Sequence, residues 1–332
     1  MNKAAGKAGK WLTRLVFAAS AFAVFAFLNN TSMFSSLPQG RPKLLAHRGV
    51  AQTFPIKGLK WNTNTAAIIY KPEHEFIENT IPSVKAAFEA GADMVEFDVR
   101  LTSDDRLAVF HDYLLDYRTD ATGMVASHTM DELRRLDVGY GYTADGGKTF
   151  PLRGKGAGLI VSAEELLAAF PGGSFLIHIK DGGAKLGKIL ADILARYDKE
   201  QIDRLGVYGD NEAITAVKQQ IPGIRVLSMQ TLKNSLIPYI LFGWTGYIPE
   251  TMRNSQVFIP LKYAKFLWGW PLKFQQRMMS VNTRLVIVNG DGKWSEGFDS
   301  EEDMNQIPAG FVGYVWTNRV DRLSANRKQI NE

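Results

Sequence analysis

Three short apolar segments carry side chains that can bind a metal ion, a proton or a phosphate. They are residues 44–49 with His47, residues 94–99 with Glu96 and Asp98, and residues 109–112 with His111. Alternate residues of a β-strand face the same way, so Glu96 and Asp98 project together. Carboxylate oxygens suit Mg²⁺ or Ca²⁺, and two imidazoles can supply a general base and a general acid. These residues predict metal-assisted chemistry on a phosphate ester.

Strands must bring these side chains to one place, and the parallel strands of an α/β barrel do so at their C-terminal ends. The predicted strands are 44–47, 94–101, 107–111, 175–179, 206–208, 225–228, 257–260, 285–288 and 312–316. Helical segments alternate with them, which implies a parallel sheet with crossover helices. About eight such strands imply closure into a TIM-type (β/α)8 barrel, and the 332 residues are enough for one barrel with additions.

The composition excludes two kinds of site. The net charge of +5 is modest, and outside the N-terminus no basic cluster is dense enough to bind nucleic acid. The chain has no cysteine, which excludes disulfides and thiolate metal sites and fits an oxidising compartment.

The N-terminus has the pattern of an export signal. Basic residues precede a charge-free run at 15–28, and they are Lys3, Lys7, Lys10 and Arg14. A run of this length suits a cleaved signal peptide, but no good small-x-small cleavage site follows it. Counted from Trp11, the helix measures about 27 Å, just enough to cross a thin bilayer. We therefore favour an uncleaved anchor over a cleaved signal.

This interpretation divides the chain into an anchor or signal at 1–28, a polar tether at 29–42 and a barrel at 43–326. The basic flank should stay in the cytoplasm. The barrel is then expected on the extracytoplasmic side, as in a bacterial inner membrane facing the periplasm. Cleavage of the N-terminus would instead make the protein secreted.

Two segments within the barrel differ from the alternating strands and helices. Residues 50–77 form a long insertion that we expect to lie over the barrel mouth and shape substrate access. Residues 232–274 are rich in aromatic side chains among Pro and Gly. Outer helices and their loops explain this second segment. The alternative is a lipid-facing wall, with Lys262, Lys265 and Lys273 toward anionic head groups.

The ordered motifs resemble the glycerophosphodiester phosphodiesterase family, in the wider superfamily of phosphatidylinositol phospholipase C-like phosphodiesterases. The matching residues are His47-Arg48-Gly49, Glu78-Asn79-Thr80, Gly91-Ala92-Asp93, Glu96-Phe97-Asp98-Val99, Thr102 with Asp104-Asp105, His111-Asp112, Asp116 with Arg118-Thr119, and Leu136-Asp137-Val138-Gly139. The resemblance is dense from about residue 44 to 180 and thin afterwards. It implies a TIM-type barrel, a divalent cation and cleavage of a phosphodiester by two histidines.

The resemblance implies a role for each candidate residue. His47 and His111 would be the catalytic acid and base, with neither role assigned to either residue. By analogy with the family, the glycerol hydroxyl next to the ester attacks first, and water then opens the cyclic phosphate. Arg48 and Lys180 would bind the phosphate. Glu96, Asp98 and Glu78 would supply oxygen ligands to Mg²⁺ or Ca²⁺.

The sequence departs from the family pattern at three places. The link between the first two motifs is usually short, and here it is the insertion at 50–77. His178 stands where the family usually has a Glu, two residues before Lys180. As a ligand, His178 would shift the preference of the site toward Zn²⁺ or Mn²⁺. The last strand ends in Thr317-Asn318 rather than Thr-Asp, and the penultimate strand lacks the family's Trp.

The main hypothesis is hydrolysis of glycerophosphodiesters by an anchored or exported enzyme. The insertion and the aromatic segment keep open a phospholipase or lysophospholipase of D or C type that acts on membrane lipids. His178 in place of a carboxylate keeps open a weakly active barrel that binds lipid. The oligomeric state does not follow from the sequence.

Overall fold

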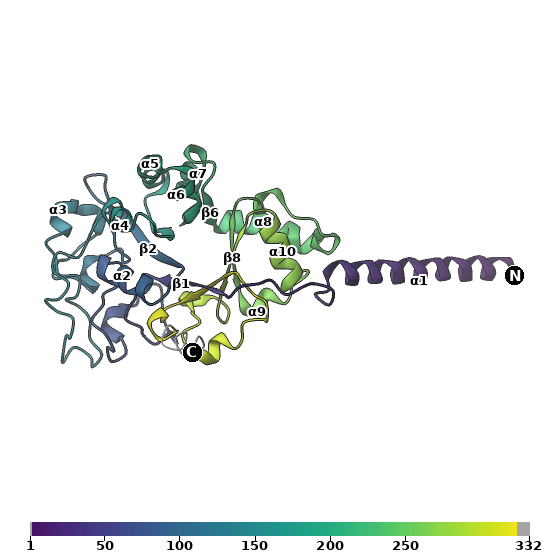
Figure 1. Ribbon diagram of the computed structural model, residues 1–332, viewed down its shortest axis with the longest axis horizontal. Helices are drawn as coiled ribbons and strands as arrows, with labels where there is room; N and C mark the ends of the chain where they lie inside the picture. Colours follow the sequence, from purple (N-terminus) through teal and green to yellow (C-terminus); the bar gives the residue numbers. More distant parts are fainter. Residues whose placement is uncertain (1, 324–332) are drawn as a thin grey trace.

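A computed structural model describes residues 2–323 of the chain (Figure 1). In these residues eight parallel strands follow one another in the order β6-β5-β4-β2-β1-β9-β8-β7, and a ninth strand, β3, pairs antiparallel with β2. The last residues of the predicted barrel, 324–326, lie outside the described part of the chain.

Most predicted strands are present within two residues of their predicted ends. The strands are β1 (Lys43–His47), β2 (Met94–Leu101), β3 (Leu107–Val109), β4 (Phe175–Ile179), β5 (Leu205–Gly209), β6 (Arg225–Ser228), β7 (Gln256–Pro260), β8 (Arg284–Val288) and β9 (Tyr314–Thr317). The α-helices are α1 (Asn2–Asn30), α2 (Ile81–Glu89), α3 (Met130–Leu133), α4 (Ala163–Ala169), α5 (Gly183–Leu194), α6 (Lys199–Arg204), α7 (Asn211–Gln220), α8 (Met229–Phe242), α9 (Leu261–Ala264), α10 (Leu272–Ser280) and α11 (Glu301–Met304).

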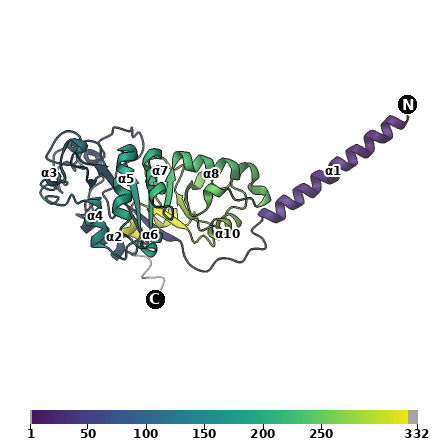
Figure 2. The ribbon, with the colours of Figure 1, turned by 90° about the horizontal axis from the view of Figure 1, so that it is seen from above.

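Apolar side chains cover both faces of the parallel sheet, as its burial requires. The interior of the ring is filled by Leu45, Met94, Leu176, Val286, Val288 and Trp316. The outer face packs against the surrounding helices, and the largest core cluster lies between them. Figure 2 shows α5, α7 and α8 side by side along one flank of the barrel. The strands are therefore rigidly held, and their C-terminal ends are fixed relative to one another.

The ring is nearly closed. No backbone pairing joins β6 to β7 in the described residues, although the Ser255 hydroxyl before β7 lies 3.4 Å from the carbonyl oxygen of Val226. Eight parallel strands with outer helices confirm the predicted fold class at this level.

The prediction of a parallel strand at 107–111 is wrong. β3 ends at Val109 and runs antiparallel to β2 outside the ring. The link between β2 and β3 holds only five residues, 102–106, whereas a parallel crossover needs a dozen or more. The hairpin turn is fastened by Thr102, whose backbone N–H donates to the Arg106 carbonyl at 2.9 Å. His111 therefore reaches the barrel mouth from the end of a hairpin.

The aromatic segment at 232–274 holds most of α8, all of β7 and α9, and the start of α10. α8 contains Pro238, and α10 follows the cis Trp270–Pro271 peptide. A second, smaller core packs residues 66–77 of the insertion against the turn-rich segment that follows β3.

The N-terminal helix α1 projects from the barrel, as Figures 1 and 2 both show. Residues Lys10–Asn30 are long and apolar enough to cross a membrane, and none of the most apolar part is buried in the protein. The helix continues two residues past the predicted end of the anchor at 28.

Candidate active site

The carboxyl ends of β1, β2, β4 and β5 form one edge of the barrel mouth, and their register brings the predicted side chains together. His47 is the register partner of Glu96, and Asp98 is that of His178. His178 is in turn the partner of Tyr208 on β5. Side chains two residues apart on a strand share a face, so these groups meet inside the ring.

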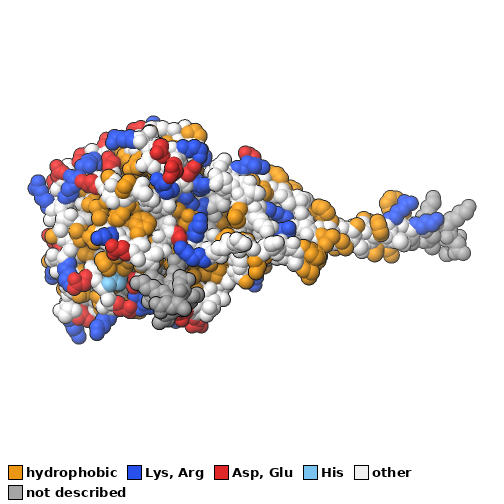
Figure 3. Space-filling view, viewed as in Figure 1, with side chains coloured by type: hydrophobic (Ala, Val, Ile, Leu, Met, Phe, Trp, Pro, Cys, Tyr) orange, Lys and Arg blue, Asp and Glu red, His pale blue; other side chains and the backbone are white. Residues whose placement is uncertain are grey.

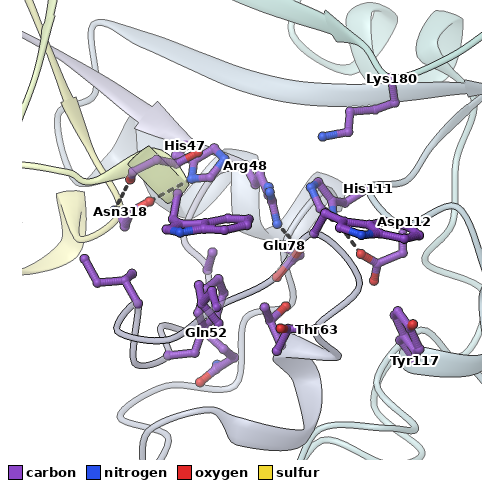
Figure 4. A pocket seen from close by; sticks show the side chains of 18 of the residues that line it. His47, Arg48, Gln52, Thr63, Glu78, His111, Asp112, Tyr117, Lys180 and Asn318 are labelled. Atoms are coloured by element: carbon purple, nitrogen blue, oxygen red, sulfur yellow. Dashed lines mark hydrogen bonds and ion pairs between the residues drawn. The ribbon is translucent and has the colours of Figure 1, made fainter. Parts of the chain in front are cut away.

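A cavity of about 500 Å³ opens at this edge (Figure 4). Its lining includes both predicted catalytic histidines, His47 and His111, and both predicted phosphate ligands, Arg48 and Lys180. The insertion at 50–77 adds apolar side chains to the wall, among them Phe54, Ile56, Leu59 and Trp61. The insertion therefore lines the same cavity as the polar groups.

His47 is held by the end of the neighbouring strand β9. Its Nδ1 lies 2.7 Å from Oδ1 of Asn318. The Asn318 amide nitrogen donates to Oδ2 of Asp299 at 2.9 Å, which fixes the orientation of the amide and leaves its oxygen to accept from His47. The proton of a neutral His47 therefore sits on Nδ1, and Nε2 carries a free lone pair.

His111 is held in the same way by a carboxylate. Its Nδ1 lies 2.7 Å from Oδ1 of Asp112, and Oδ2 of Asp112 accepts from Nε of Arg118 at 2.5 Å. Because burial opposes ionisation but Arg118 and His111 favour it, the pKa of Asp112 stays below its usual range. An ionised Asp112 can only accept, so His111 also presents an unprotonated Nε2.

Both histidines bind a second proton weakly, because the pKa of each imidazole is lowered. Burial first, and then the positive charge of Arg48, lowers the pKa of His47 and that of His111 to about 4. At neutral pH both imidazoles are uncharged, and an anion entering the cavity would favour protonation of either one.

Arg48 occupies an unusual backbone position with a φ of 59°, in the left-handed region. Its backbone N–H donates to Oε2 of Glu96 at 3.1 Å, and its guanidinium lies 2.8 Å from Glu78 and 3.1 Å from Asp98. Gly49 follows with a φ of 79°, and a Cβ there would lie 2.6 Å from the Ser83 hydroxyl. The His-Arg-Gly motif is thus a tight turn that holds the guanidinium at the cavity wall.

Glu96, Asp98 and His178 bring three donor atoms within 4.8 Å of one another. Glu96 accepts from the Tyr208 hydroxyl at 2.7 Å, and the His178 ring stacks on Tyr208 with centroids 4.0 Å apart. Oδ2 of Asp98 accepts a hydrogen bond from the Asn79 side-chain amide at 2.9 Å. This set of two carboxylates and one imidazole can hold a divalent cation.

The surroundings of one carboxylate oxygen, Oδ1 of Asp98, favour a metal ion at this group. Oδ1 of Asp98 is fully buried and accepts no hydrogen bond, although Nδ1 of His178 lies 3.0 Å and Nζ of Lys180 3.7 Å away. Burial opposes the ionisation of Asp98, but Arg48 and Lys180 hold its pKa well below the usual range. A buried, ionised carboxylate oxygen that lies beside a second potential ligand, His178, fits a cation ligand.

Glu78 lies outside this donor group. One oxygen lies 2.8 Å from Arg48 and the other 3.3 Å from Arg118, so both are engaged by guanidinium groups. Burial opposes its ionisation, yet Arg118 and Arg48 lower the pKa of Glu78. Its geometry is that of a residue that positions Arg48.

Lys180 follows β4 directly and points into the cavity in Figure 4. Burial lowers the pKa of its ammonium group, although Asp98 opposes that shift. Lys180 and Arg48 thus place positive charge at the wall that also carries the donor group.

Sequence reasoning did not assign roles to several residues that complete the site. They are Asn79, Asp112, Tyr208, Asp299 and Asn318. The sequence did point to Tyr208, because Tyr208 ends the predicted strand that comes after the strand of His178. The contact between Asn318 and His47 joins residues 271 positions apart, and only the folded barrel reveals it.

Comparisons with known proteins agree with this geometry. Residues 47–209 match the model of the glycerophosphoryl diester phosphodiesterase family. A glycerophosphodiester phosphodiesterase of Caldanaerobacter subterraneus is 47% identical over 62 residues, which are 19% of this chain and 26% of that protein. One from Bacillus altitudinis is 35% identical over 111 residues, 33% of this chain and 36% of that protein. The matched segments thus span about a quarter to a third of these relatives.

Solved structures share the fold over much more of the chain. A glycerophosphodiester phosphodiesterase from Agrobacterium tumefaciens has a TM-score of 0.58 at 19% identity, over 86% of this chain and all of that one. A phosphodiesterase from Oleispira antarctica, solved with the product sn-glycerol-3-phosphate, has a TM-score of 0.56 at 15% identity, over 88% of this chain and 97% of that one. Through residues 47–209, this chain belongs to the glycerophosphoryl diester phosphodiesterase family.

Proposed function

We propose that this protein hydrolyses glycerophosphodiesters to an alcohol and glycerol phosphate. The observation that carries the proposal is the paired arrangement of His47 and His111. Each has Nδ1 tied to an acceptor and Nε2 left free, and both line one cavity with Arg48 and Lys180. Membership of the family supports the same reaction.

The residues divide the work of phosphodiester cleavage. Arg48 and Lys180 hold the phosphate, since a phosphodiester anion repels nucleophiles until its charge is compensated. One histidine takes the proton of the glycerol hydroxyl next to the ester as that oxygen attacks phosphorus. The other, protonated once the anion has entered, gives its proton to the leaving alcohol. Water then opens the cyclic phosphate, with the two proton transfers reversed.

Glu96, Asp98 and His178 are proposed to hold a divalent cation. When bound, the ion supplies positive charge at the reacting phosphate. With Glu78 engaged by two arginines, the group has two carboxylates and one imidazole. Such a set accepts Mg²⁺ or Ca²⁺ less readily than an all-oxygen set, and it suits Zn²⁺ or Mn²⁺ better.

The N-terminal helix is proposed to be a membrane anchor that leaves the barrel on the extracytoplasmic side. We keep the predicted division into an anchor at 1–28, a tether at 29–42 and a barrel at 43–326. The basic residues before the apolar run support this orientation.

A second candidate substrate is a lysophospholipid. The observation in its favour is the apolar wall that the insertion adds beside the polar groups, with Phe54, Leu59 and Trp61. Such a wall would bury part of an acyl chain. Turnover of micellar lysophosphatidylcholine relative to glycerophosphocholine distinguishes the two substrates.

The test is a metal-dependent assay of the full chain on a panel of these diesters, with His47→Ala and His111→Ala variants. His128→Ala is the matched control, because His128 is only partly buried and lies outside the cavity. The proposal predicts a loss of roughly 10²–10⁴-fold in kcat for the first two variants and wild-type activity for the third. Full activity of both cavity variants would overturn it. Lipid binding without metal binding or turnover would instead indicate a lipid-binding barrel.

A further inference from the structure

The C-terminal end of α1 is held against the barrel by hydrogen bonds. Nη2 of Arg277 on α10 donates to the backbone carbonyl of Asn29 at 3.0 Å, and Nη1 donates to the Asn30 side chain at 3.0 Å. The amides of Asn29 and Asn30 both donate to the carbonyl of Trp244, at 2.8 and 2.9 Å. Trp244 belongs to the 3₁₀ helix η4 (Gly243–Thr245), which follows α8 directly. These contacts fix the position of α1 relative to α8 and α10.

Trp244 also packs along the apolar part of α1. Its ring lies 4.7 Å from that of Phe22 and 6.1 Å from that of Phe25, measured between centroids. The apolar run ends at Leu28, three to six residues beyond these phenylalanines. At 1.5 Å per residue, Trp244 reaches about 5–9 Å inside the end of the apolar run. If α1 spans a bilayer, η4 and the end of α8 must enter its interface.

The surface around η4 has the composition that such a position requires. Large hydrophobic side chains of the last turns of α8 and of the α9 region are exposed, and we call them the α8–α9 patch: Ile237, Ile240, Leu241, Phe242, Tyr263 and Phe266. Phe266 is 66% and Leu241 58% exposed, which is unusual for side chains of this size on a water-facing surface. The Trp268 indole donates to the Ile240 carbonyl at 2.8 Å and joins the two parts.

The figures show which helices of the barrel lie nearest to α1. Figure 2 shows α8 and α10 at the end of the barrel from which α1 departs. Figure 3 shows hydrophobic side chains gathered where the body of the protein narrows toward the helix. Exposed hydrophobic side chains therefore lie on the part of the barrel that α1 leaves.

The charges of this region complement an anionic lipid surface. Residues 229–280 contain six Lys or Arg residues and one acidic residue, Glu250. Lys262 and Lys265 stand beside the patch, with their ammonium groups 5.7 Å from the Tyr263 ring and 5.3 Å from the Phe266 ring. Aromatic side chains flanked by lysines are typical of the boundary between acyl chains and head groups.

We propose that the α8–α9 patch inserts into the bilayer interface next to α1, so that the barrel rests on the membrane in one fixed orientation. This inference rests on the proposed anchoring by α1, and it adds a second contact that α1 alone does not require. The occupant of the patch is lipid: the depth of Trp244 beside Phe22 sets the patch at the interface, where an interfacial helix lies about 5–10 Å deep.

The absence of cysteine makes a direct test simple. Single-cysteine variants Leu241→Cys and Phe266→Cys of the full chain are labelled with the fluorophore NBD and placed in phosphatidylcholine–phosphatidylglycerol vesicles at a low protein-to-lipid ratio. Phe17→Cys in the middle of α1 reports insertion of the anchor. Asp131→Cys is the water-facing control, because Asp131 is exposed on α3, at the end of the molecule opposite α1.

The proposal predicts that NBD emission at 241 and 266 shifts to the blue and is quenched by lipids with a nitroxide at a shallow acyl position. The label at 131 should show neither effect. Quenching at 17 without quenching at 241 and 266 would overturn the patch and leave the anchor standing. No quenching at 17 would overturn the anchor and with it the patch. A blue shift at 241 that grows with protein density and resists lipid-borne quencher would mean that a second copy of the chain covers the patch. Turnover of the soluble diester reports on the hydrolytic function separately.

Discussion

Nδ1 of His47 lies 2.7 Å from Oδ1 of Asn318, a contact that joins the end of β1 to the end of the adjacent strand β9. Asn318 is itself held by Asp299, which accepts from its backbone N–H at 2.6 Å and from its amide at 2.9 Å. The chain from Asp299 through Asn318 to His47 fixes which imidazole nitrogen faces the cavity. Unlike the Asp112 that holds His111, Asn318 does this without a negative charge.

Replacing Asn318 tests whether this contact positions the imidazole. In Asn318→Ala, His47 loses the acceptor that fixes its tautomer, so we expect kcat to fall at least about tenfold, and less than in His47→Ala. KM should change little, because Arg48 and Lys180 are untouched. Steady-state kinetics on glycerophosphocholine measures both constants. Equal losses in kcat and in thermal stability, with Asn318→Ser no better, would indicate a structural role only.

The pH profile follows from the lowered pKa of the two histidines. Burial and Arg48 bring both to about 4, and the base works only when unprotonated. Activity is therefore expected to persist as pH falls through 6, where an ordinary histidine protonates, and to be lost only near pH 4. The acid limb of kcat/KM measures this value. Repeating it at two metal concentrations is the control, since a limb caused by loss of the metal moves with concentration. A midpoint above pH 6 that is independent of metal would contradict the account.

His178 should determine the metal preference. His178→Glu would give the group a third carboxylate, and we expect affinity to move from Zn²⁺ or Mn²⁺ toward Mg²⁺ or Ca²⁺. Calorimetric titration of the metal-stripped protein with each cation measures the change. Tyr208→Phe is a useful companion, because it removes the hydroxyl on Glu96 while keeping the ring beneath His178. An unchanged order of affinities in His178→Glu would show that His178 is not a ligand.

Arg118 should matter for stability more than for binding. Its buried guanidinium contacts Asp112 and Glu78 and donates to the Tyr142 hydroxyl at 2.7 Å. Arg118→Met leaves two buried carboxylates short of a partner, and breaking such a network costs about 3–5 kcal/mol. Urea denaturation measures the free energy of unfolding. Arg134→Met is the matched control, since Arg134 pairs with two carboxylates on the surface and should cost at most about 1 kcal/mol. Equal losses would contradict the argument.

The sequence predicted those elements that are defined by local pattern. The bounds of β2 and β4 follow from short segments rich in Val, Leu, Ile and Phe, and both agree with the structure. The shared face of Glu96 and Asp98 and the position of His178 near the end of β4 follow from the same segments. Outer helices were expected in the aromatic segment, but the bounds of α8 were not predicted, because Pro238 and the mixed aromatic sequence conceal its helical period.

Contacts that depend on register lay beyond the sequence. Nothing local to Glu78 says that Arg118, 40 residues away, would engage the oxygen that a metal could use. The antiparallel direction of β3, by contrast, could have been predicted from the sequence. The link between β2 and β3 has five residues, which is enough for a hairpin but too short for a parallel crossover. The sequence therefore predicted the residues of the site more fully than the contacts between them.

The central claim is that His47 and His111 act together on a phosphodiester bound in this cavity. Phosphorus NMR of glycerophosphoethanolamine, incubated with the metal-loaded full chain, follows that reaction without a coupled assay. The account predicts that the diester signal is replaced by that of glycerol phosphate with wild type, and that it persists with His47→Ala, with His111→Ala and after chelation of the metal. Conversion at the wild-type rate by both histidine variants would contradict it.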